Sequence, residues 1–145
     1  MQRMIKPTKD YLKMKFNEYN ELYFDGILPP CKISVHKAKG YFGSYNILSG
    51  NKPRISIAEY VYWTEEELKL TLIHEMVHHY VCFIDKPKHF VLPHGYLFRR
   101  ECRKLKNKYG LDIRVLSIPD VYFYKEKIPT THIGKLWRRY IGLRF

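Results

Sequence analysis

The sequence predicts a small α+β domain, because two kinds of hydrophobic periodicity alternate along the chain: helical repeats flank a run of short strands. The chain has 145 residues, 46% of them hydrophobic, which suits one domain with its own core. We expect an N-terminal helix, a short antiparallel sheet of three to four strands, and two further helices. Residues 1–118 should form this domain, and residues 119–145 a basic, aromatic extension that is not an independent domain.

The first helix is predicted from Thr8 to Tyr23, where apolar residues recur every three or four positions and the Asp25-Gly26 pair ends the pattern. Strands are predicted at 32–37, 41–45 and 53–58, where apolar and polar residues alternate. The segments that connect these strands are short and contain glycine and proline. This spacing favours an antiparallel meander over parallel crossovers.

A second helix should begin at Thr64, which forms a capping box with Glu67, and continue to about Ile84. A third helix is expected from His94-Gly95 to Gly110, where a glycine ends it. A fourth strand at 111–116 and a short helix near the C-terminus complete the expected elements.

The strongest functional motif is His74-Glu75-Met76-Val77-His78 on the predicted second helix. A spacing of four places both imidazoles on one helical face, where they can bind one metal ion. Neutral imidazoles suit Zn²⁺, and two histidines with one further protein ligand leave a fourth position open for water. We therefore expect one Zn²⁺ per chain, with Glu75 as the general base of a hydrolase.

Several downstream residues could supply the third ligand, and His94 is the preferred one because Gly95 beside it allows close backbone approach. Glu101 lies on the same face of the third helix, so it is an alternative ligand or a hydrogen-bond partner of a ligating histidine. His79 lies about 100° around the helix from His78 and is expected in a supporting or surface position. The other candidates are His89 and His132. The extended motif that needs Gly and His at positions 81 and 84 is excluded, because Val and Ile stand there.

Four segments together resemble the SprT-like zinc metallopeptidase domain, which also occurs in the Spartan DNA-dependent proteases. They are LYFDGILP at 22–29, GYFG with RISI at 40–57, HEMVHHY at 74–80 and HGYLF at 94–98. The resemblance covers about residues 8–115 and implies a zincin-like fold. It also implies that His74, His78 and His94 bind zinc and that Glu75 is catalytic in an endopeptidase. One departure is clear: no cysteine follows Pro119, so the zinc ribbon of many family members is missing.

The net charge of +12 favours a polyanionic partner, and nucleic acid is the leading one, with DNA implied by the family resemblance. Basic residues concentrate at 99–108 and 125–145, whereas residues 56–85 carry six acids and one lysine. The residues expected to contact nucleic acid are Arg99, Arg100, Arg103, Lys104, Trp137, Arg138 and Arg139. With its resemblance to DNA-dependent proteases, the chain is expected to cleave proteins or peptides, including DNA-associated ones.

A second function class is a non-catalytic nucleic-acid-binding protein in which the zinc site is structural. A fourth protein ligand on the metal would favour it, and an open position would favour catalysis. The sequence contains no apolar stretch long enough to span a membrane and no secretory signal, so a cytoplasmic location is expected.

Overall fold

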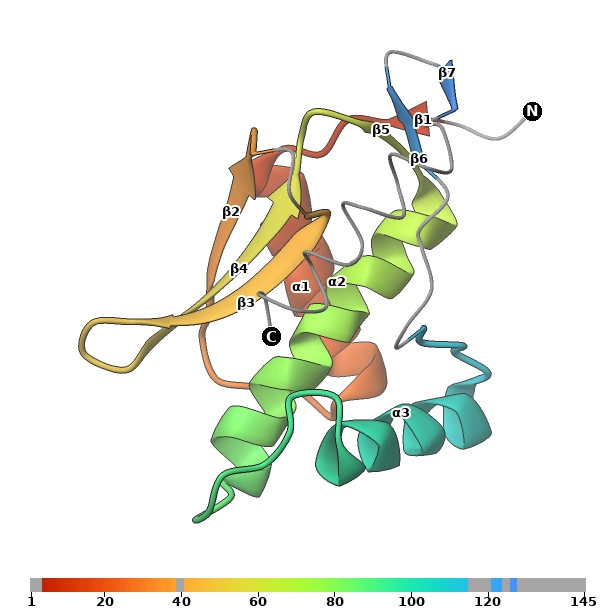
Figure 1. Cartoon of the computed structure of the whole chain (residues 1–145). Helices are drawn as coiled ribbons and strands as arrows, with labels where there is room; N and C mark the ends of the chain where they lie inside the picture. The colour runs from red at the N-terminus through yellow and green to blue at the C-terminus, as the bar shows by residue number, and fades with distance from the viewer. Residues whose placement is uncertain (1–3, 39–40, 115–120, 124–125, 128–145) are drawn as a thin grey trace.

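A computed structural model describes residues 4–38, 41–114, 121–123 and 126–127, and it confirms the α+β class (Figure 1). The helices are α1 (Lys9–Tyr23), α2 (Glu65–Tyr80) and α3 (Tyr96–Tyr109), and a π-helical turn, η1 (Val81–Asp85), follows α2. One sheet contains β2 (Lys32–His36), β3 (Gly43–Leu48) and β4 (Lys52–Ala58). The other contains β1 (Met4–Ile5), β5 (Tyr62–Thr64), β6 (Val121–Phe123) and β7 (Glu126–Lys127).

The predicted antiparallel meander is wrong in one pairing. The strand order is β2-β4-β3; β3 is antiparallel to β4, as expected for a hairpin, but β2 runs parallel to β4. Four consecutive residues of β4, from Ile55 to Ala58, are buried, so β4 takes the central position where both of its edges are hydrogen-bonded. Turn residues mark where strands break, but they do not determine which strand the chain returns to.

The helices cover the sheet in an order that places α2 next to β3. Helix α1 packs against β2, and α2 packs against β3 and β4, with α3 against α2 (Figure 1). The core between them contains Leu12 and Phe16 of α1, Ile55 of β4 and Ile73 of α2. Among the described residues, no helix is both long enough and apolar enough to cross a membrane.

Most predicted element boundaries agree with the structure. Thr8 caps α1 by accepting a hydrogen bond from the Tyr11 amide at 3.2 Å, and Gly110 ends α3 in a left-handed conformation with φ of 71°. Residues 111–114 form no strand, which corrects that part of the expected fourth strand, because the chain there packs Leu111 and Ile113 into the core instead of pairing. Residues 115–116 of the expected fourth strand and the predicted C-terminal helix lie outside the described residues.

Candidate metal centre

Helix α2 brings the first two histidines together. The helix begins where the Thr64 hydroxyl accepts a hydrogen bond from the Glu67 amide at 3.2 Å, as the capping box predicts. From that start, the spacing of four places His74 and His78 on one face, with their ring centroids 5.1 Å apart. Both side chains are buried.

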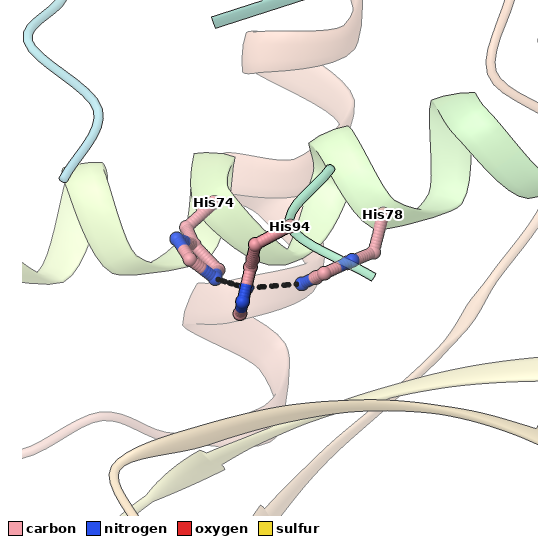
Figure 2. A group of neighbouring side chains, drawn as sticks. All are labelled: His74, His78 and His94. Atoms are coloured by element: carbon pink, nitrogen blue, oxygen red, sulfur yellow. Dashed lines mark hydrogen bonds between the residues drawn. The ribbon is translucent and has the colours of Figure 1, made fainter. Parts of the chain in front are cut away.

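A tight turn between η1 and α3 supplies the third histidine. In this turn the Gly95 amide donates to the Leu92 carbonyl at 3.0 Å, so that His94 projects toward α2 (Figure 2). The His94 Nε2 atom lies 3.1 Å from Nε2 of His74 and 3.1 Å from Nε2 of His78. The three histidines form the group of ligand atoms in the described part of the chain that could hold a metal ion.

The protonation states of these rings favour metal binding. The His74 Nδ1–H donates to the Arg114 carbonyl at 3.0 Å, because a carbonyl can only accept, and so the lone pair of Nε2 points into the cluster. Burial, followed by the electrostatic effect of His94, lowers the pKa of His74 to about 3. Burial and the charge of Arg99 lower the pKa of His94 to about 4, and burial keeps the pKa of His78 well below its usual value. All three rings are therefore neutral at pH 7.

The cluster fits a tetrahedral zinc ion. Nitrogen atoms on such an ion lie about 3.4 Å apart, because each Zn–N bond is about 2.1 Å. The two separations that involve Nε2 of His94, both 3.1 Å, are close to this value, and all three ligand atoms lie within 4.8 Å of one another. The Nε2 atom of His94 faces two other imidazole nitrogens, yet one N–H could satisfy only one of them. A shared cation resolves the remaining repulsion between lone pairs. The three imidazoles can therefore hold a metal ion such as Zn²⁺.

Glu75 lies beside this cluster and is fully buried on α2. A Cβ atom added to Gly43, the first residue of β3, would lie only 3.0 Å from Oε1 of Glu75. It would also lie 3.2 Å from a methyl carbon of Thr71 and 3.4 Å from Ile57. Gly43 therefore provides the space that the carboxylate occupies, a role that the sequence motif did not indicate.

The other predicted ligands do not join the cluster. Glu101 is buried on α3, where its carboxylate lies 3.7 Å from Lys104 Nζ, and burial raises its pKa. It is outside the histidine group, and its carboxylate faces Lys104 of the same helix. His89 is exposed on the loop, and His132 lies outside the described residues.

His79 was expected in either a supporting or a surface position, and the surface position is wrong. It is fully buried: Nε2–H donates to the Pro29 carbonyl at 2.8 Å, so Nδ1 accepts from the Tyr45 hydroxyl, also at 2.8 Å. The Tyr45 ring in turn lies nearly parallel to the ring of His78, at 15° and 6.2 Å between centroids. The pair Tyr45–His79 thus connects β3, α2 and the end of the loop after α1. Tyr45 belongs to no sequence motif, and only its position within a period-two strand could have indicated this role.

The residues expected to contact nucleic acid divide into two groups. Arg99, Arg100, Arg103 and Lys104 are exposed on α3. Three of them already have partners, since Arg99 donates to the His94 carbonyl at 2.9 Å, Arg100 pairs with Asp85 at 2.7 Å and Lys104 lies over the Tyr80 ring at 5.5 Å. Trp137, Arg138 and Arg139 lie outside the described residues.

The fold and the site define a class: a small α+β domain whose central helix carries an HExxH motif and contributes two of three clustered histidines. The model of the SprT-like family matches residues 12–117, and the chain belongs to this family. This match includes Gly43, Tyr45 and the complete histidine cluster. A search of curated proteins finds no significant match.

Proposed function

We propose that this protein is a zinc-dependent metallopeptidase, specifically an endopeptidase, and that His74, His78 and His94 hold one Zn²⁺. The observation that carries the proposal is the buried group of three neutral imidazoles with a buried glutamate adjacent in sequence. Membership of the SprT-like family supports it. Three protein ligands suit a catalytic zinc ion, which acts as a Lewis acid and lowers the pKa of a water molecule at its open position.

The protein's own groups would perform the proton transfers. Glu75 would accept a proton as the nucleophile attacks the peptide carbonyl and then deliver it to the departing amine. The space beside Gly43 sets the position of the carboxylate, and the Arg114 carbonyl fixes the ring orientation of His74. Among the described residues, β3 pairs with β4 alone in its sheet, so its other edge can accept an extended peptide as an additional strand.

The substitution Glu75→Gln tests this proposal, since glutamine preserves the shape of the side chain but cannot accept the proton. We expect cleavage of an unstructured protein such as casein to fall by about 10²–10⁴-fold with the zinc content unchanged. The matched control is Glu66→Gln, which alters an exposed glutamate of the same helix and should leave cleavage intact. Undiminished cleavage by Glu75→Gln, or full cleavage by zinc-free protein, would refute the assignment.

We also propose that DNA binds the exposed basic face of α3, with DNA-associated proteins as substrates. Arg99, Arg103 and Lys106 lie near one another around a cavity of about 200 Å³ between α3 and the following segment. The net charge of +12 supports binding to a polyanion. Affinity for a single-stranded oligonucleotide should then fall steeply with salt concentration. If neither wild type nor Glu75→Gln cleaves casein while this binding is strong, the alternative of a structural zinc site in a nucleic-acid-binding protein is favoured.

A further inference from the structure

The loop that joins η1 to α3 exposes an unusual number of apolar side chains. Eight large hydrophobic residues are exposed in the described part of the chain, and four of them lie within seven positions. These four residues, here called the apolar patch, are Phe90 (87% exposed), Val91 (36%), Leu92 (68%) and Tyr96 (69%). Isolated exposed apolar residues are ordinary, but a contiguous group indicates an interaction surface.

The apolar patch is connected to the candidate metal centre by a short hydrogen-bonded turn. Leu92 and Gly95 close the turn that presents His94, through the hydrogen bond of 3.0 Å between the Gly95 amide and the Leu92 carbonyl. A Cβ atom on Gly95 would lie 3.1 Å from both Cβ and the carbonyl oxygen of Leu92, so the turn is tightly closed. A group that binds Leu92 is therefore held two residues from His94.

The charged residues at positions 86–100, which include the apolar patch, are all basic. Residues 86–100 contain four basic residues, Lys86, Lys88, Arg99 and Arg100, and no acidic residue. Two acids flank this range: Asp85, whose carboxylate pairs with Arg100 at 2.7 Å, and Glu101, which is buried and lies 3.7 Å from Lys104 Nζ. A partner that combines an apolar side chain with acidic neighbours complements this surface.

We propose that the apolar patch recognises a large apolar side chain flanked by acidic residues in an extended polypeptide substrate. This inference rests on the proposed peptidase function, because the patch adjoins the site where the scissile bond would lie. Two of the four side chains favour a polypeptide over nucleic acid: Val91 and Leu92 offer no ring on which a base could stack, and Phe90 is the most exposed ring of the patch. The ring of Tyr96 already has the Arg100 guanidinium over it, 5.8 Å from the centroid.

The test measures binding without turnover, using the zinc-loaded full chain carrying Glu75→Gln. One fluorescein-labelled peptide contains a central Leu-Phe pair flanked by Asp and Glu, and a second has serine in place of Leu and Phe. Fluorescence anisotropy should show the first peptide binding at least tenfold more tightly, because even partial burial of two apolar side chains corresponds to a tenfold gain in affinity. Adding Phe90→Gln and Leu92→Gln should abolish this difference, and each single substitution should reduce it.

The matched control replaces two exposed apolar residues of α1, Met14→Gln with Leu22→Gln, and should retain the tenfold preference. Equal affinity for the two peptides, or a preference that survives loss of Phe90 and Leu92, overturns the proposal. It is also overturned if the patch substitutions abolish binding to a thymidine oligonucleotide or to phosphatidylserine vesicles but not to the peptide. If wild-type protein cleaves neither peptide, the peptidase proposal fails, whereas the binding comparison stands.

Discussion

Helices α2 and α3 both carry predicted site residues, yet they use their polar side chains in opposite ways. Helix α2 buries eleven of its sixteen residues, and five of these are titratable: Glu67, His74, Glu75, His78 and His79. Helix α3 buries four of its fourteen residues, of which only Glu101 is charged, and it directs its arginines and lysines to solvent.

This difference identifies where the chemistry is concentrated. Burying a polar side chain costs free energy unless it has a partner, so a helix with five buried titratable groups must supply partners for them. The partners come from separate parts of the chain: Arg114 pairs with Glu67, its carbonyl accepts from His74, and Tyr45 donates to His79. Exposed charges on α3 need no such arrangement, and most contribute little to stability.

The largest effect on folding is expected at His79, whose replacement tests whether buried polar groups of α2 depend on their partners. The substitution His79→Leu leaves the Tyr45 hydroxyl and the Pro29 carbonyl buried without their hydrogen bonds. We expect a loss of about 3 kcal/mol in the free energy of unfolding, measured by urea denaturation. The control His89→Leu alters an exposed histidine and should change the free energy by less than about 0.5 kcal/mol. Similar values for the two variants would contradict the proposed difference.

A smaller effect on stability, with a specific loss of activity, is expected for Gly43→Ala. The φ angle of Gly43 is not positive, so alanine adds no backbone strain, but its methyl group would press on the Glu75 carboxylate. Because Glu75 can shift, we expect stability to change little while kcat falls by about tenfold to a hundredfold with unchanged zinc content. Ser44→Ala, on the next residue of the strand, is the matched control. Full activity of Gly43→Ala would show that Glu75 is not positioned by β3.

The smallest effect on stability is expected for a substitution on α3. Arg103→Gln removes an exposed charge and should change the free energy of unfolding by less than about 0.5 kcal/mol, with normal zinc content. If DNA binds this face, the slope of log affinity against log salt concentration should decrease by about 1 for a single-stranded oligonucleotide. An unfolded or zinc-free Arg103→Gln protein would remove the distinction between the two helices.

The sequence predicted most of the fold because local signals mark its helices. The caps at Thr8 and Thr64 and the glycine at position 110 set helix ends correctly, and the spacing of His74 and His78 places them on one face. Pairing of β2 with β4 was missed because strand order depends on packing between residues distant in sequence. Gly43 and Tyr45 were missed as supporting residues for the same reason: their partners, Glu75 and His79, lie more than thirty positions away.

Binding of one zinc ion by three histidines is measured most directly by metal content. Wild-type protein and His94→Ala would be purified in parallel and analysed by inductively coupled plasma mass spectrometry, each after equilibration with zinc and removal of unbound metal. We predict about one zinc per chain in wild type and a large loss in His94→Ala, because only two of the three imidazoles remain. Absence of zinc from wild type, or full retention by His94→Ala, would contradict the account.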